Sequence, residues 1–215
     1  MTPELQTTLE EQRAFAVIRT ETAAQALQAA RACLAGGLRL IEITLTVPDA
    51  LDVVGRLAED KGAIVGVGSL VDAAQVAPAA RAGAKFAVSP HFDGEILAEA
   101  KAHGLLASMG GVTATEAMAC HRAGVDVTKI FPAAAFGPAY LKALREPLPF
   151  LRLMPTGGVD ESNLRAWLDA GAAAVGLGGS LADRKTVAAG DFRSVEERAR
   201  RVVAMVAEWR SQRVR

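Results

Sequence analysis

One phrase that recurs four times constrains the fold of this chain more than any other feature. Ala-Gly occurs at residues 35–36, 82–83, 123–124 and 170–171, each time at the end of an Ala-rich helical run. A glycine after a helix supplies the left-handed C-cap conformation at little steric cost. The apolar stretches that follow read LRLIEITL, AKFAVSP, VDVTKIFP and AAAVGLGG. The phrase therefore predicts four junctions between a helix and a strand.

Four further apolar stretches, AFAVIR, AIVGVGS, LLASMGG and FLRLMPTGG, lie between these copies, which gives eight expected strands with a helical run after each. Strands that alternate with helices form a parallel sheet, and eight such units close a barrel. The alternative is an open doubly wound sheet, but no G-x-G-x-x-G phrase follows the first strand. We predict an α/β fold, a (β/α)₈ TIM barrel, with residues 1–215 forming one domain that begins with an N-terminal helix.

Composition excludes several classes of protein. Hydrophobic residues make up 51% of the chain and the formal net charge is zero, so we expect neither disorder nor a charged surface for nucleic acid or membrane. No apolar run is long enough to span a bilayer, and the first 13 residues do not resemble a signal peptide. Cys33 and Cys120 lie in Ala-rich helical runs and are interpreted as small core residues. A cytoplasmic location is the expectation.

Active sites of such barrels lie at the C-terminal ends of the strands. Polar side chains and glycines gather at the ends of all eight expected strands. In chain order these residues are Arg19; Glu42 and Thr44; Ser69; Ser89, Pro90 and His91; Gly110 and Gly111; Lys129 and Phe131; Gly157 and Gly158; and Gly178, Gly179 and Ser180.

Two charged residues are expected inside the barrel. In the second strand Ile41 and Ile43 alternate with Glu42, and the aliphatic residues must face the surrounding helices. Lys129 stands in the middle of an apolar strand, where a lysine is costly unless it is paired or functional. The second and sixth strands lie opposite each other in a ring of eight. Glu42 and Lys129 can therefore meet, either as a structural ion pair or as a catalytic pair.

The catalytic interpretation is a Schiff-base enzyme. A lysine must be neutral to attack a carbonyl, and burial disfavours its charged form. A nearby carboxylate can move protons as the imine forms and as the bond breaks. The other five lysines, Lys61, Lys85, Lys101, Lys142 and Lys185, are expected to be solvated.

Glycine pairs follow the seventh and eighth strands, at Gly157-Gly158 and Gly178-Gly179. Backbone N–H groups at helix N-termini there would form the phosphate site that recurs in these barrels; simple turns are the alternative. The three histidines are scattered, and we expect no metal site and no cofactor. His91 either lines the mouth of the barrel or belongs to a structural loop.

Six motifs together resemble one family. IEITLTVPDA, GVGSL, SPHFD, TKIFPAAAFGP, MPTGGV and AVGLGGSL stand in order and at family spacing over about Phe15 to Leu181. They are similar to the 2-keto-3-deoxy-6-phosphogluconate (KDPG) aldolases. Relatives of these enzymes use the galactonate epimer or 4-hydroxy-2-oxoglutarate (KHG).

The resemblance implies a class I, metal-independent aldolase that yields pyruvate and glyceraldehyde 3-phosphate from a small phosphorylated keto sugar acid. It implies Lys129 as the Schiff-base residue and Glu42 as the general acid and base. It also implies a homotrimer. Substrate contacts are implied for Arg19, Thr44, Ser69, Pro90 and Phe131, and phosphate contacts for Gly157, Gly158, Gly179 and Ser180.

Three departures from the family pattern concern the pocket wall: Thr46 in place of an arginine, Met109 in place of a proline, and Ala134-Ala135 in place of a glutamate-containing segment. They bear on the choice of substrate. The rival functions are a phosphosugar isomerase or epimerase without a covalent lysine, and a non-catalytic protein that binds a phosphate ligand.

Overall fold

The computed structural model describes residues 2–213 and contains the eight expected strands. They are β1 (Ala14–Ile18), β2 (Leu40–Thr44), β3 (Ile64–Gly68), β4 (Phe86–Val88), β5 (Leu106–Gly110), β6 (Val127–Ile130), β7 (Leu153–Pro155) and β8 (Val175–Leu177). All seven pairings between neighbouring strands are parallel, in the order β7-β6-β5-β4-β3-β2-β1-β8. A parallel bridge between Thr156 and Gly176 joins the two ends of the sheet. The predicted TIM barrel is confirmed.

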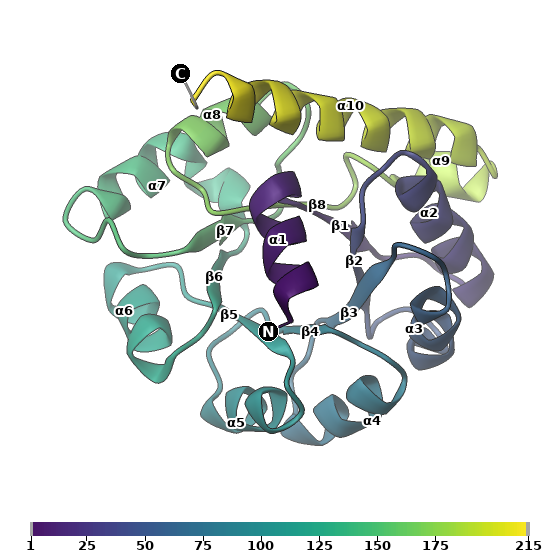
Figure 1. Ribbon diagram of the computed structural model, residues 1–215, viewed down its shortest axis with the longest axis horizontal. Helices are drawn as coiled ribbons and strands as arrows, with labels where there is room; N and C mark the ends of the chain where they lie inside the picture. Colours follow the sequence, from purple (N-terminus) through teal and green to yellow (C-terminus); the bar gives the residue numbers. More distant parts are fainter. Residues whose placement is uncertain (1, 214–215) are drawn as a thin grey trace.

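The chain also forms helices, and all of them except α1 surround this ring of strands (Figure 1). They are α1 (Pro3–Gln12), α2 (Ala23–Ala35), α3 (Ala50–Ala58), α4 (Val76–Arg81), α5 (Gly94–Ala102), α6 (Ala114–Ala123), α7 (Gly137–Arg145), α8 (Leu164–Asp169), α9 (Arg184–Ala188) and α10 (Phe192–Ser211). Short 3-10 turns, η1 (Ala73–Gln75) and η2 (Ala133–Ala135), precede α4 and α7. Within residues 2–213 no helix has the length and apolar character needed to cross a membrane.

Several helices begin where the sequence offers an N-cap side chain. Thr22 caps α2 by accepting a hydrogen bond from the Gln25 N–H. Thr113 and Glu116 form a reciprocal capping box at the start of α6. The repeated Ala-Gly phrase acts as predicted at Gly83, Gly124 and Gly171, which all have positive φ.

Gly36 is an exception to that prediction. Its φ is −72°, and the following Gly37 takes the positive φ of 92° instead. The reason that position 36 requires glycine is packing. A Cβ there would lie 2.5 Å from the Glu196 carbonyl oxygen of α10.

Two hydrophobic clusters share the strands between them. Outward side chains such as Ile41, Ile43 and Met109 pack under the helices, and Cys33 and Cys120 are buried in the same layer. Inward side chains form a second, smaller cluster, which contains the first residues of β2 to β6: Leu40, Ile64, Phe86, Leu106 and Val127.

Helix α1 closes one end of the barrel. Its Leu5 and Leu9 are 1% exposed and belong to the inner cluster. Figure 1 shows α1 lying across the centre of the ring of strands. Because the cluster contains the first residues of the strands, α1 covers their N-terminal ends. The C-terminal ends are left for a site.

Candidate active site

Lys129 of β6 and Glu42 of β2 meet inside the barrel. Lys129 Nζ lies 3.5 Å from Glu42 Oε1, and the two side chains are 7% and 1% exposed. The predicted approach of these two inward charges is confirmed. Both Glu42 carboxylate oxygens lack a hydrogen-bond partner among residues 2–213, so the ion pair has no supporting hydrogen bonds. A buried pair of that kind adds little to stability, which favours a chemical role.

Strand β3 leaves room for the carboxylate. Gly68 pairs with Thr44 in the sheet, and a Cβ at Gly68 would lie 1.9 Å from Glu42 Oε1. Any larger residue at this position would push the carboxylate away from its place. The second glycine of the GVG phrase is thus explained by the space that Glu42 occupies, and the first, Gly66, by Phe86, whose ring would lie 2.3 Å from a Cβ there.

A cavity of about 590 Å³ opens at the C-terminal ends of β7, β8 and β1. Its lining comprises Val17, Arg19, Phe131, Thr156, Gly157, Gly158, Val159, Asp160, Gly178, Gly179, Ser180, Ala182 and Arg184. Phe131 is 41% exposed, and its ring centroid lies 5.7 Å from Lys129 Nζ. The Phe131 ring therefore connects the lysine with the cavity.

The lining of this cavity does not include three of the expected substrate contacts, Ser69, Thr44 and Pro90. The Arg19 guanidinium donates to Ser69 Oγ over 3.3 Å, which ties the ends of β1 and β3 together. Thr44 is buried; its hydroxyl donates to the Ile18 carbonyl over 3.3 Å. Pro90 is exposed at the end of β4. Of the expected substrate contacts, only Arg19 and Phe131 border the cavity directly.

The expected phosphate residues all line the cavity, but in turns. Gly157 and Gly158 have φ of 82° and 81°. Helix α8 begins only at Leu164, after a turn in which Asp160 accepts from the Ser162 and Asn163 N–H groups. These hydrogen bonds also lower the pKa of Asp160, with the Ser162 hydroxyl as the largest cause.

The segment after β8 is also a turn. The Leu181 and Ala182 N–H groups donate to the Gly178 carbonyl, and α9 begins only at Arg184. The prediction that the glycines stand at helix N-termini is therefore wrong. The Ser180 hydroxyl donates to the Val159 carbonyl over 2.7 Å, so it links the two turns.

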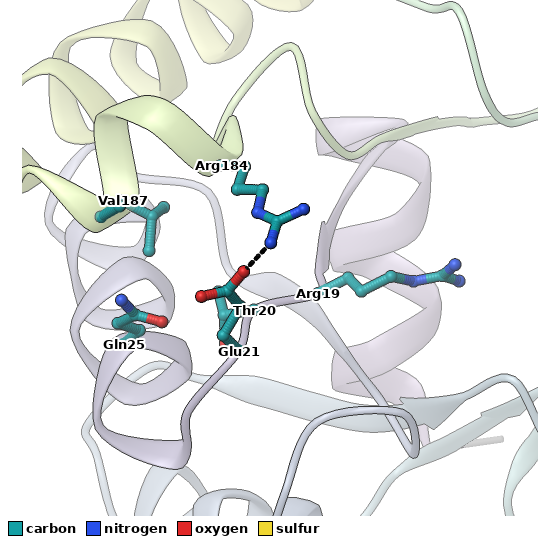
Figure 2. A pocket seen from close by; sticks show the side chains of 7 residues that line it. Arg19, Thr20, Glu21, Gln25, Arg184 and Val187 are labelled. Atoms are coloured by element: carbon teal, nitrogen blue, oxygen red, sulfur yellow. Dashed lines mark ion pairs between the residues drawn. The ribbon is translucent and has the colours of Figure 1, made fainter.

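A second cavity of about 380 Å³ adjoins the first and shares Arg19 and Arg184 with it. Figure 2 shows the Arg184 guanidinium reaching across to the Glu21 carboxylate, with which it forms an ion pair. Neither Arg184 nor Glu21 is predicted from the sequence to belong to the site. The sequence feature that could have indicated them is their position: Arg184 follows the C-terminal end of β8, and Glu21 follows the C-terminal end of β1.

His91 belongs to a loop and does not line either cavity. Its Nδ1 lies 3.2 Å from Ser89 Oγ, and its side chain is 47% exposed. Among residues 2–213, His, Cys, Asp and Glu side chains do not form a group of three suited to a metal ion.

Two of the three departures from the family pattern lie in different surroundings. Met109 is fully buried under the helices, so the expectation that it touches the pocket wall is wrong. Odd positions of β5 point outward, because Leu106 belongs to the inner cluster. Ala134 does lie beside the mouth: its N–H donates to the Gly157 carbonyl.

Comparisons with known proteins show the family of this chain. Residues 5–198 match the model of the KDPG and KHG aldolase family. The chain is 35% identical to the 2-dehydro-3-deoxy-6-phosphogalactonate aldolase of Escherichia coli K12, over 91% of this chain and 94% of that protein. It is also 35% identical to the 2-dehydro-3-deoxy-phosphogluconate aldolase of Pseudomonas aeruginosa, with 97% and 96% covered.

A solved structure is similar as well. KDPG aldolase from Legionella pneumophila, with pyruvate captured as a covalent carbinolamine intermediate, superimposes with a TM-score of 0.83. It is 27% identical, and 94% of this chain and 98% of that one are covered. The family match, the sequence identity and the shared barrel point to the same conclusion: this chain belongs to the KDPG and KHG aldolase family, whose members are class I pyruvate aldolases and carbon–carbon lyases.

Proposed function

We propose that this chain cleaves 2-keto-3-deoxy-6-phosphogluconate to pyruvate and glyceraldehyde 3-phosphate through a Schiff base on Lys129. The observation that carries the proposal is the distance of 3.5 Å between Lys129 Nζ and Glu42 Oε1 in a buried setting. A nucleophile and a proton carrier at this separation are what imine chemistry requires.

The reaction begins with addition of neutral Lys129 Nζ to the C2 carbonyl of the substrate, which gives a carbinolamine. Glu42 donates a proton to the departing hydroxyl group, water leaves, and an iminium forms. Glu42, now a carboxylate, accepts the proton of the C4 hydroxyl, and the C3–C4 bond breaks. The bonding electrons move into the iminium to form an enamine, while glyceraldehyde 3-phosphate leaves.

The second half of the reaction returns the enzyme to its starting state. Glu42 returns its proton to C3 of the enamine, and water hydrolyses the resulting iminium to pyruvate and free Lys129, while the proton released goes back to the Glu42 carboxylate. The Phe131 ring, 5.7 Å from the amine, would cover the reacting carbons and limit access of water.

The remaining polar groups divide between the two ends of the substrate. We assign the substrate carboxylate to Arg19 and Ser69, which are already hydrogen-bonded to each other, with Thr44 and Pro90 beside them. The phosphate is assigned to Gly157, Gly158, Gly179 and Ser180, whose turns line one cavity. Positive φ at Gly157 and Gly158 brings the backbone close to an anion, as in other backbone nests.

The galactonate epimer is the second candidate substrate, and KHG is the third. The galactonate enzyme of Escherichia coli is as similar to this chain, at 35% identity, as the gluconate enzyme of Pseudomonas aeruginosa. Only the configuration at one carbon separates the two sugar acids. Retro-aldol kinetics on both epimers and on KHG decide between them: we expect the highest kcat/KM for the gluconate compound.

Borohydride trapping tests the covalent step. Pyruvate and sodium borohydride are added to the protein, and the digested peptides are analysed by mass spectrometry. We expect a reduced pyruvyl adduct on Lys129 and none on the exposed Lys142, which serves as an internal control. Absence of an adduct on Lys129 would favour an isomerase or epimerase, which needs no imine.

We also propose that residues 1–215 form one domain and that the protein assembles as a homotrimer, as the resemblance to the family implies. Two exposed apolar side chains support an interface: Val71 is 61% exposed and Phe92 is 38% exposed. They lie on loops that leave the neighbouring strands β3 and β4.

A further inference from the structure

A third pocket, lined mainly by arginines, lies at the opposite end of the barrel from the active site. Its volume is about 350 Å³, and four arginines line it: Arg13, Arg145, Arg210 and Arg213. Trp209 and Gly171 complete most of its wall, and the lining contains no carboxylate. Pockets that bind small ligands begin at about 300 Å³, so this one suits a small metabolite.

The arginines come from segments that are distant in sequence. Arg13 joins α1 to β1, Arg145 ends α7, and Arg210 belongs to the end of α10, with Arg213 just beyond it. Figure 1 shows the end of α10 beside α8, and Gly171, two residues after the end of α8, forms part of the wall. Convergence of four cations from three parts of the chain is a cost to folding unless negative charge compensates it.

Compensation within the described chain is small. Asp169 forms an ion pair with Arg213, whose Nη2 lies 3.3 Å from Asp169 Oδ1, and the same carboxylate oxygen accepts from Trp209 Nε1 over 2.8 Å. Arg145 and Arg210 donate to the backbone carbonyls of Pro149 and Glu11, which satisfy hydrogen bonds without cancelling charge. The Trp209 ring lies 5.2 Å from the Arg13 guanidinium and 4.5 Å from that of Arg213, a further weak attraction.

Arg13 shows the imbalance most clearly. Its Nε is buried and has no hydrogen-bond partner within residues 2–213. Burial lowers the pKa of the Arg13 guanidinium, and the positive charges of Arg210 and Arg213 lower it further; Glu10 acts in the opposite sense. A buried N–H donor without an acceptor is costly, and more so when the group is charged.

We propose that this arginine pocket binds a small, multiply charged oxyanion of the phosphate class. A phosphate group offers several acceptor oxygens and at least one full negative charge, and guanidinium groups bind it in a forked geometry. The pocket stands apart from the catalytic mouth, so this inference does not depend on the aldolase activity.

Fluorescence of Trp209 tests the proposal locally. The chain has two tryptophans, so Trp167→Phe leaves Trp209 as the only indole. Neither tryptophan lines the cavities at the active-site mouth, so binding of an anion there is not the source of a Trp209 signal. Diphosphate is titrated at constant ionic strength, and orthophosphate and glycerol 3-phosphate are compared with it. The order of affinities distinguishes a free inorganic anion from a phosphate ester.

We expect a saturable change in the Trp209 signal with diphosphate. In the same background, Arg13→Gln and Arg210→Gln should each weaken binding at least tenfold. Arg210 is exposed, so its replacement leaves the fold intact even if the half-buried Arg13 proves necessary for folding. Arg193→Gln, at an exposed arginine at the other end of α10, is the matched control and should bind normally.

Three results would overturn the proposal. These are a signal that never saturates, a signal that sodium chloride of equal ionic strength reproduces, and an unchanged affinity in the Arg210→Gln protein.

Discussion

At the residue scale, Glu42 is the side chain whose surroundings are most specialised. Both its oxygens are buried, and its charged neighbour is Lys129 Nζ. Replacement by glutamine keeps the shape and removes the ability to exchange protons. We expect Glu42→Gln to lower kcat by about 10²- to 10⁴-fold, the usual contribution of a general acid or base.

Rates of borohydride trapping separate this role from a structural one. In the Glu42→Gln protein the adduct on Lys129 should still form, but more slowly, because dehydration of the carbinolamine lacks its acid. A variant with normal kcat would show that Glu42 is only a counter-ion.

Arg184 and Glu21 offer a second residue-scale prediction. Arg184 lines the cavity that contains the phosphate turns, while Glu21 holds its guanidinium by an ion pair. Arg184→Gln should raise KM for the phosphorylated substrate about threefold, because an exposed cation contributes modestly to binding. Glu21→Gln should lower KM, since it frees the guanidinium for the phosphate.

Unphosphorylated KHG provides the control for the Arg184 prediction. Its KM should not change in either variant, because it has no phosphate for the guanidinium to meet. Equal changes for both substrates would assign Arg184 to the shape of the mouth instead of to phosphate binding.

The sequence predicted single residues well wherever side-chain alternation decided their direction. Glu42 and Lys129 point inward because their aliphatic neighbours must face the helices. The prediction for Met109 is wrong, because it rests on the pattern of the family. The alternation of β5 places Leu106 inside the barrel and therefore Met109 outside. Contacts between loops, such as the hydrogen bond from Ser180 to the Val159 carbonyl, have no periodic signal and could not be predicted.

At the element scale, the strands are the predictable part and the turns after them are not. Each strand coincides with an apolar stretch, because burial on both faces demands apolar residues. The turns after β7 and β8 depend on side-chain hydrogen bonds such as those of Asp160, which shift the start of α8 to Leu164. Glycine alone therefore marks the turn and not the helix that follows it.

Strand β3 carries a prediction of its own. A Cβ at Gly68 would overlap Glu42 Oε1, so Gly68→Ala should displace the carboxylate from Lys129. We expect kcat to fall at least tenfold, together with a loss of stability of about 1–3 kcal/mol from overpacking. Urea unfolding and steady-state kinetics measure the two effects.

Gly94→Ala is the matched control for the Gly68 variant. Gly94 is the first residue of α5, and a Cβ there would meet no atom within 4 Å. Normal kcat in Gly94→Ala and in Gly68→Ala alike would show that the tight fit of β3 against Glu42 is not needed for activity.

Helices α9 and α10 are joined by Asp183, which carries a pH-dependent contribution. Asp183 accepts hydrogen bonds from the Thr186 N–H and hydroxyl groups and from Arg198 Nη1. The hydrogen bonds from Thr186, and then that from Arg198, hold the pKa of Asp183 well below its usual range. The stabilisation is therefore complete above the unfolded-state pKa of about 3.9 and is lost as pH falls below it.

Asp183→Asn retains an N-cap and removes the charge. We expect the variant to be less stable than the parent at pH 7, by an amount that shrinks below about pH 4, where Asp183 becomes protonated in the unfolded parent chain. Urea unfolding midpoints of the parent and the variant, at pH 7 and at a pH below about 4, measure this difference in stability. Arg198→Gln should give a similar and non-additive loss, and a difference that grows on acidification would contradict the assignment.

At the scale of the whole molecule, the two ends of the barrel differ in chemistry. Helix α1 fills the N-terminal end with Leu5 and Leu9, while the C-terminal end leaves glycine turns and two connected cavities. The sequence predicted that an N-terminal helix exists but not where it docks, because its short apolar stripe fits any apolar surface. The strand order explains the docking, since the chain enters β1 at the end that α1 covers.

The loops after β3 and β4 form an exposed apolar edge that bears on assembly. The loops that carry Val71 and Phe92 are tied together, because the Leu70 N–H donates to the Val88 carbonyl over 3.2 Å. Two exposed apolar side chains on loops that are hydrogen-bonded to each other are suited to the core of an interface between copies of the chain. We expect light scattering to give three times the chain mass of 22.4 kDa.

Charge placed on that edge tests where the trimer forms. Val71→Glu and Phe92→Glu should each lower the measured mass toward that of one chain, because a carboxylate buried in an interface is costly. Phe150→Glu is the control: Phe150 is 50% exposed but packs against the His121 ring before β7, away from β3 and β4, so the mass should not change. A single-chain mass for the parent protein would refute the trimer, whereas an intact trimer in both edge variants would move its interface to another face of the barrel.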